Sequence, residues 1–186
     1  MKREPFPFSG SRRSAALLAL MLLSACSAGQ VGPKENLPTP NSLQERVRNL
    51  EDREEIGRLL VLYGRYLDRR DFASFAMLFS EKEGEWIGGM GRAKGRDNIR
   101  NLMESTIGDL PEDAASSGYH VFTNASIETD GDRASAETKW IFMMPGADGR
   151  PQPVYLGHYE DAFIREKEGW RFLRRTAVSD IPQDTR

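Results

Sequence analysis

The sequence predicts an α+β domain in which three helices are followed by a curved antiparallel sheet. Apolar residues recur every three or four positions up to residue 107, which indicates amphipathic helices. From residue 119 onward apolar and polar residues alternate, and Gly and Asp residues separate the alternating segments, which is typical of hairpins. Helices that come first and antiparallel strands that follow favour an α+β arrangement, with the sheet curling over the helices.

The first predicted helix begins at Ser42, with Ser42 or Asn41 as its cap, and carries a charged first half. Its apolar face is formed by Ile56, Leu59, Leu60, Tyr63 and Leu67. A break at residues 69–71 precedes a shorter helix over 72–79, and Asp71 is expected to be its N-cap. A third helix is predicted over 97–107.

The remaining segments are predicted to be strands and turns. Residues 84–95 contain five Gly and one Trp, which suits a bent strand or a hairpin. A loop is expected over 109–118 and a turn-rich connection over 145–153. The strands of the sheet are predicted over 119–128, 133–144, 154–165 and 170–178, with tight turns at 130–132 and 166–169.

Composition excludes several classes of protein. The chain has 186 residues, of which 39% are hydrophobic and 29% charged, with one Cys, two His and a net charge of -2. One Cys cannot form a disulfide framework, and one Cys with two His is too few for a structural zinc module. The near-neutral charge argues against a nucleic-acid partner, which needs a basic surface. The length favours one domain.

The first 25 residues are predicted to be a lipoprotein signal peptide. Four basic residues precede nine consecutive apolar residues at 15–23, a run too short to span a bilayer. The small residues that follow lead to Cys26 and resemble a bacterial lipoprotein box, in which cleavage before the Cys is followed by lipidation. An ordinary signal peptide is the alternative. We expect an envelope protein anchored at the periplasmic face, and Ser27 favours the outer membrane.

The mature chain divides into a tether and one domain. Removal of the signal takes away four basic residues and one acidic residue, so the net charge changes from -2 to -5. Residues 26–41 form the lipidated Cys and a Pro- and Gly-containing tether, residues 42–181 the domain, and residues 182–186 a tail.

Several short motifs occur in the order found in one family. They are residues 63–72 (YGRYLDRRDF), 95–99 (GRDNI), 120–124 (HVFTN), 157–161 (GHYED) and 168–172 (EGWRF). In their order and spacing they resemble a SnoaL-like domain of the nuclear transport factor two-like superfamily, which includes scytalone dehydratase and ketosteroid isomerase. The resemblance implies a cone-shaped fold, with a pocket between the curved sheet and the long helix, and a homodimer as an expectation.

Within that pocket, the resemblance implies a catalytic pair formed by Asp68 and His120. A carboxylate that accepts one ring N–H of a His fixes its tautomer and raises the basicity of the other nitrogen, so the pair can transfer protons. Two alternatives stay open, because Asp68 at the edge of the helix face could be solvated and His120 could be structural. The candidate pocket lining is Tyr63, Trp86, Asn124, Trp140, Tyr159 and Asp161.

The sequence departs from the dehydratase pattern in three places. Residues 133–144 contain no second His, Leu67 stands where the relative has a Tyr, and Trp86 lies near the position of a substrate-orienting Tyr. His158 does not replace the missing His, because strand alternation places it with Glu160 on the opposite face from Tyr159. Solvated positions are expected for His158 and for Arg171, Arg174 and Arg175. Asn124 bonds either a ligand or the backbone.

Two functions follow from the sequence. The first is a cofactor-free dehydratase or isomerase that acts on a small hydrophobic hydroxy-carbonyl compound through His120 and Asp68. The second is a noncatalytic lipoprotein that binds an apolar ligand or a protein partner, since one fold supports many functions. No metal site is predicted, because no close ligand spacing is present.

Overall fold

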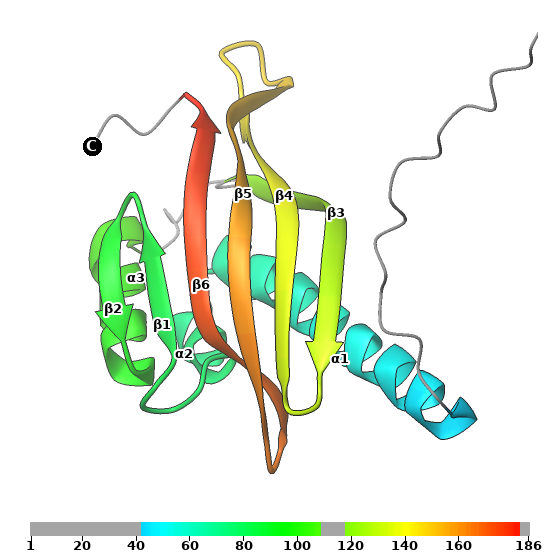
Figure 1. Cartoon of the computed structure of the whole chain (residues 1–186). Helices are drawn as coiled ribbons and strands as arrows, with labels where there is room; N and C mark the ends of the chain where they lie inside the picture. The colour runs from blue at the N-terminus through cyan, green and yellow to red at the C-terminus, as the bar shows by residue number, and fades with distance from the viewer. Residues whose placement is uncertain (1–41, 109–117, 183–186) are drawn as a thin grey trace, which may run out of the picture. The chain divides into compact units, whose positions relative to one another are not determined.

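The computed structural model describes residues 42–108 and 118–182. These residues hold three helices and six strands, in the order α1, α2, β1, β2, α3, β3, β4, β5, β6 (Figure 1). No helix among them is both long enough and apolar enough to cross a membrane. The predicted signal, Cys26, the tether, the loop at 109–117 and the last four residues of the tail lie outside the described residues.

The three helices begin and end close to their predicted bounds. Helix α1 covers Leu43–Asp68, and Ser42 and Glu45 form a capping box at its start. Helix α2 covers Phe72–Met77, with Asp71 as N-cap accepting a hydrogen bond from the Ser74 backbone N–H at 3.0 Å, so this prediction is confirmed. Helix α3 covers Arg96–Ile107.

The six strands form one sheet in the order β2-β1-β6-β5-β4-β3. The hairpin predicted over 84–95 consists of β1 and β2. Strand bounds are Glu85–Gly88 for β1, Gly91–Lys94 for β2, Tyr119–Asp130 for β3, Arg133–Pro145 for β4, Pro151–Glu166 for β5 and Gly169–Ile181 for β6. The antiparallel meander predicted from residue 119 onward is confirmed in β3 to β6, and the parallel pairing of β1 with β6 makes the whole sheet a mixed one.

The core lies between α1 and the inner face of the sheet, which we define as the face turned toward α1 (Figure 1). The alternation predicted for β4 is confirmed, since Ala134, Ala136, Thr138 and Trp140 are buried. Tyr63 of α1 is 1% exposed and lies at the centre, where its ring contacts those of Phe75, Phe122, Tyr159 and Phe172. The inner face of the sheet is therefore strongly aromatic.

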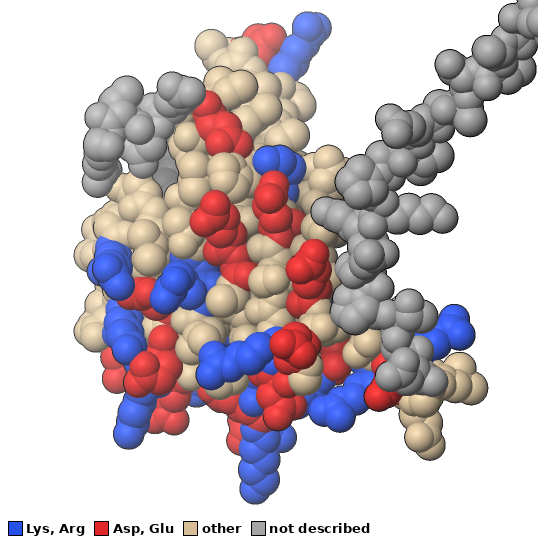
Figure 2. Space-filling model, in the orientation of Figure 1, with Lys and Arg blue, Asp and Glu red and all other residues tan. Residues whose placement is uncertain are grey.

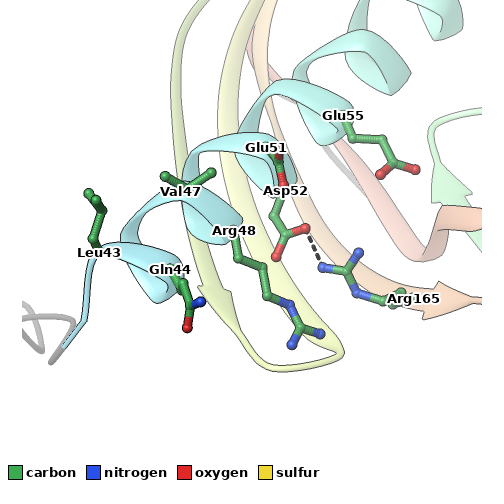
Figure 3. Close-up of a pocket in the computed structure, with 8 residues that line it drawn as sticks. All are labelled: Leu43, Gln44, Val47, Arg48, Glu51, Asp52, Glu55 and Arg165. Carbon is green, nitrogen blue, oxygen red and sulfur yellow. Dashed lines mark ion pairs between the residues drawn. The ribbon is translucent and has the colours of Figure 1, made fainter.

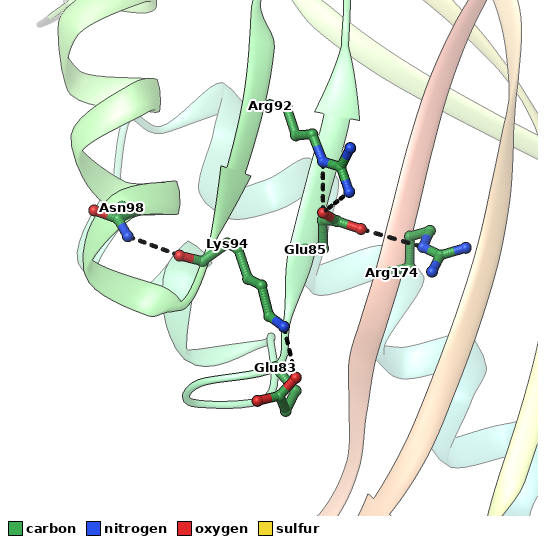
Figure 4. Close-up of polar contacts among 6 residues, drawn as sticks. All are labelled: Glu83, Glu85, Arg92, Lys94, Asn98 and Arg174. Carbon is green, nitrogen blue, oxygen red and sulfur yellow. Dashed lines mark hydrogen bonds and ion pairs between the residues drawn. The ribbon is translucent and has the colours of Figure 1, made fainter.

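The outer face of the sheet carries charged side chains (Figure 2). Near the β2 edge of the sheet, the buried Glu85 of β1 pairs with Arg92 of the neighbouring β2 and with Arg174 of β6 (Figure 4). Both arginines are more than half exposed, so the solvated position predicted for Arg174 is confirmed. The two faces thus differ in kind, one aromatic and one charged.

Candidate functional site

Asp68 and His120 meet where the end of α1 lies against the start of β3. Nδ1 of His120 lies 2.6 Å from Oδ1 of Asp68, and the backbone N–H of His120 donates to both carboxylate oxygens at 3.2 and 3.3 Å. Their side chains are 16% and 18% exposed, for His120 and Asp68 respectively. The alternative of a solvated Asp68 is wrong, because the carboxylate is mostly covered and binds His120 at two points.

The chain turn after Asp68 fixes the position of this carboxylate. Arg70 has a positive φ of 59°, its N–H donates to the carbonyl of Leu67, and the N–H of Asp71 donates to that of Tyr66. This pair of bonds is a Schellman motif, which ends the helix directly after Asp68. The negative end of the helix dipole disfavours a carboxylate at this position. The bonds to His120 offset that cost.

Aromatic rings surround His120. Its ring centroid lies 4.6 Å from that of Phe142, 6.1 Å from that of Phe122 and 6.5 Å from that of Trp140. Phe122 and Phe142 are half-buried, whereas Trp140 is 9% exposed. A titratable His–carboxylate pair among apolar rings is an arrangement that can bind an apolar molecule and exchange a proton with it.

Tyr63 and Trp86 contact each other deeper on the inner face. Nε1 of Trp86 donates to the hydroxyl of Tyr63 at 2.9 Å, and both residues are buried. Burial raises the pKa of the Tyr63 hydroxyl, and burial raises that of Tyr159 well above its usual value. Both hydroxyls therefore stay protonated at neutral pH.

Asp161 forms a buried ion pair with Arg175. Nε and Nη2 of Arg175 each donate to a different carboxylate oxygen at 2.7 Å, and the Arg175 side chain is 0% exposed. Its guanidinium carbon lies 4.0 Å from the ring centroids of Tyr63 and Tyr159. The solvated position predicted for Arg175 is therefore wrong. Asp161 lies on the inner face as predicted, with both oxygens occupied.

A β-bulge explains the wrong prediction for Arg175. The register between β5 and β6 shifts at Ala162 and Phe163, so Phe172 and Arg175 share the inner face although they are three residues apart. Strict alternation from Trp170 and Phe172 would instead place Arg175 outside. A signal was present in the sequence, because an inward Asp161 needs a cationic or hydrogen-bonding partner.

Asn124 lies in another β-bulge, on exposed backbone. The register of β3 shifts between Thr123 and Ser126, and Asn124 has a φ of 53°, which Asn adopts more readily than most residues. Its side-chain oxygen accepts a hydrogen bond from the Thr123 hydroxyl at 3.1 Å. The backbone conformation supplies a reason for this residue that involves no ligand.

His158 forms a second His–carboxylate pair, on the outer face. Its Nδ1 lies 3.0 Å from both carboxylate oxygens of Asp180, and Glu160 lies 3.9 Å from its Nε2. The face predicted for His158 is confirmed, although its side chain is 21% exposed and so only partly solvated. No aromatic ring lies close to it among the ring contacts of the described residues.

Two clefts of the described residues are lined by neither Asp68 nor His120. One, of about 590 Å³, lies between the first turns of α1 and Arg165 of β5 (Figure 3). There the buried Asp52 pairs with Arg165 and accepts from Nε1 of Trp170, contacts that fix α1 to the sheet. The other, of about 410 Å³, lies beside Asp71 and Arg100. Within residues 42–108 and 118–182, no group of three or more His, Cys, Asp or Glu could hold a metal ion.

Comparisons with known proteins agree with the fold described above. The family described as SnoaL-like domain matches residues 48–176. An uncharacterized protein of Mycobacterium tuberculosis is 32% identical over 131 residues, which cover 69% of this chain and 86% of that protein.

Solved structures share the fold. An NTF2-like protein with a cystatin-like fold from Novosphingobium aromaticivorans is 27% identical, with a TM-score of 0.64, over 76% of this chain and 92% of that one. A scytalone dehydratase candidate from the same organism is 23% identical, with a TM-score of 0.58, over 70% of this chain and 85% of that one. The second likeness shows the fold alone.

Proposed function

The chain belongs to the SnoaL-like domain family, and from this premise we propose that it binds a small molecule on the inner face of its sheet and moves a proton there with His120. One observation carries the proposal, namely the 2.6 Å contact between Nδ1 of His120 and Asp68 among aromatic rings. The fold is shared with dehydratases, which supports a reaction of this kind.

The proposed chemistry follows from the tautomer of His120. When the ionised Asp68 accepts a hydrogen bond from the Nδ1–H group of His120, the lone pair of the neutral ring lies on Nε2. Nε2 then removes a proton from a carbon next to a carbonyl, and the C–H electron pair forms the new double bond. In a dehydration the adjacent C–O bond breaks, and the hydroxide leaves as water with the proton from His120. In an isomerisation the proton returns to another carbon.

The Asp68–His120 pair supplies one general acid–base, the imidazole of His120. The favoured reactions are therefore those in which a single group both removes and returns the proton. Strand β4, Arg133–Pro145, contains no second His. His158 lies on the outer face, bound to Asp180, and takes no part. A reaction in which one group removes the proton and later delivers it to the leaving oxygen or to carbon meets this constraint.

Proton exchange between a ketone and D₂O tests the proposal without knowledge of the natural substrate. We expect the protein to exchange the α-protons of 2-tetralone or cyclohexanone, followed by NMR, faster than buffer alone. His120→Ala should lower the protein-catalysed rate at least about 100-fold, the lower range for a general base.

His158→Ala is the matched control, because it removes a His of similar exposure that also binds an Asp. This variant should exchange the ketone at the wild-type rate. Equal loss in both variants, or an unchanged rate in His120→Ala, contradicts the role of His120. Ketone binding without any exchange in the wild-type protein indicates the noncatalytic binding function instead.

We further propose that the mature chain is anchored by lipid at Cys26 to the periplasmic face of a bacterial membrane. The order of basic residues, apolar run, small residues and Cys supports this. Metabolic labelling with an alkyne fatty acid should mark the wild-type protein and leave Cys26→Ala unmarked. Equal labelling, or a soluble wild-type protein after fractionation, contradicts the anchor.

A further inference from the structure

The inner face of the sheet holds hydrogen-bond donors that have no partner within residues 42–108 and 118–182. They are the indole N–H of Trp140, the hydroxyl of Thr138 and Nη1 of Arg175, and all three groups are buried. A buried polar group without a hydrogen-bond partner destabilises the fold, and native proteins retain few of them. Three on one face therefore require an explanation. We call these three residues the donor patch.

The donor patch is contiguous and is centred on Tyr159. Thr138 lies opposite Tyr159 in the β4–β5 register, and Trp140 follows two residues later on the same face. The ring centroids of Trp140 and Tyr159 are 5.7 Å apart, and the guanidinium of Arg175 lies 4.0 Å from the Tyr159 ring. The three groups thus belong to one region.

The side-chain acceptors nearest to the donor patch already accept hydrogen bonds from other donors. Both oxygens of Asp161 accept from Arg175, and the Tyr63 hydroxyl accepts from Trp86. A Trp N–H and an Arg N–H can only donate, whereas a Thr hydroxyl can do either. The Trp140 and Arg175 donors of the patch have no acceptor among the described residues, and the group that complements them is an atom with lone pairs.

We propose that the donor patch binds an oxygen acceptor of the ligand, a carbonyl first of all, while the apolar remainder of the ligand lies against the rings around His120. This inference rests on the proposed function and names its substrate class. Trp140 joins the two regions, since its ring lies 6.5 Å from that of His120 and 5.7 Å from that of Tyr159.

The arrangement places the two chemical requirements of the reaction side by side. A carbon acid loses its proton more readily when its carbonyl oxygen accepts hydrogen bonds, because the negative charge of the enolate develops on that oxygen. Phe122 and Phe142 flank His120 and are only half-buried, which leaves this side of the inner face partly accessible. Trp140 is then a specificity-determining residue that selects ligands with an acceptor.

Indole NMR resonances test this directly. The sequence contains three Trp, so ¹⁵N-labelled protein gives three Nε1–H signals, and Trp140→Phe assigns the relevant one. Trp86 and Trp170 already donate to Tyr63 and Asp52, and serve as internal controls. On saturation with 2-tetralone, the Trp140 signal should move downfield while the other two change little.

Tetralin, which has the same ring frame and no acceptor, is the matched ligand. We expect it to bind about tenfold more weakly than 2-tetralone, the effect of one lost hydrogen bond to a buried donor. Trp140→Phe should remove most of that preference. Thr138→Val, which preserves the side-chain shape, should reduce it in a protein with a wild-type circular dichroism spectrum.

Three results overturn the inference: a Trp140 signal that stays in place at ketone saturation, equal affinity for ketone and hydrocarbon, or binding of neither probe. Equal affinity is also the result expected if buried water satisfies the donors. Failure of the proposed function is distinguishable, because His120→Ala should lose exchange while keeping the Trp140 shift and the ketone preference.

Discussion

Asp68 holds His120 at two atoms, since its carboxylate lies 2.6 Å from the ring Nδ1 and accepts the backbone N–H at 3.2 Å. The two residues are 52 positions apart, so the contact fastens the end of α1 to the start of β3. One carboxylate thereby orients the ring and stabilises the fold. Substitutions that differ in the atoms they keep can separate these two effects.

Asp68→Asn should impair proton transfer more than stability. The amide oxygen still accepts the backbone N–H of His120, but the amide N–H₂ favours the tautomer that lacks a lone pair on Nε2. We expect ketone exchange to fall about 10²- to 10⁴-fold, the range for loss of general base catalysis. Asp68→Ala should also lower the free energy of unfolding by about 1–3 kcal/mol, because the buried donors lose their acceptor. Denaturant unfolding and exchange rates check both, and a wild-type rate in Asp68→Asn contradicts the role.

Arg70→Gly should stabilise the domain. Arg70 has a φ of 59° at the position after the α1 cap, where helices usually carry Gly. Relief of this strain exceeds the extra chain entropy of Gly by about 0.5–1 kcal/mol. Arg70→Ala is the control, because it removes the charge and keeps the strained Cβ. Urea unfolding should show a higher free energy of unfolding for Arg70→Gly and not for Arg70→Ala. An equal increase in both variants would show that removal of the charge causes the effect.

Local patterns carried most of what could be predicted from the sequence. The three- and four-residue spacing located α1, and the alternation in β4 identified its inner face, because burial of one face imposes a period on the chain. The Asp68–His120 pair came from family resemblance, since two residues 52 positions apart give no local sign of their contact.

Features that depend on distant pairing could not be predicted. The parallel contact of β1 with β6 joins Glu85 to Arg174, and no local pattern in a four-residue strand records its partner. The bulge near Phe172 inserts a residue that reverses the alternation, and so moved Arg175 from the expected outer face to the core. Both features involve β6, the strand that contributes Arg175 to the donor patch.

Arg174 and Arg175 should differ sharply although they are adjacent. Arg174 is 62% exposed and Arg175 is fully buried against Asp161. Arg175→Ala leaves Asp161 as an unpaired buried carboxylate and should cost about 3–5 kcal/mol, whereas Arg174→Ala should cost less than about 1 kcal/mol. The double variant Asp161→Leu with Arg175→Met should recover much of the loss. Denaturant unfolding measures all three, and similar costs for the two single variants would contradict the buried pair.

Gly64 and Gly57 of α1 should respond oppositely to replacement by Ala. A Cβ at Gly64 would lie 2.2 Å from the Phe122 ring, whereas a Cβ at Gly57 would meet nothing within 4 Å. Gly57→Ala should stabilise the domain by about 0.5–1 kcal/mol through helix propensity. Gly64→Ala should destabilise it by about 1–3 kcal/mol, because Phe122 must move. Thermal unfolding compares them, and a gain at Gly64 would show that Phe122 yields freely.

Asp71 should make the stability of the domain depend on pH in the acid range. Hydrogen bonds from the Ser74 side chain and backbone lower the pKa of Asp71 in the folded protein, whereas an unfolded Asp titrates near about 3.9. Its contribution is therefore fully present above that unfolded value and is lost as the pH falls through the lower folded value. Asp71→Ala should cost about 1 kcal/mol at pH 7, the usual effect of an N-cap, and less at pH 3. Asp71→Asn, a cap that does not titrate, should keep a constant advantage over Ala at both pH values. Urea unfolding of the wild type and the two variants at both pH values measures these differences in the free energy of unfolding. If the wild type exceeds Asp71→Ala by the same amount at pH 3 and pH 7, the charge of Asp71 contributes nothing to the cap.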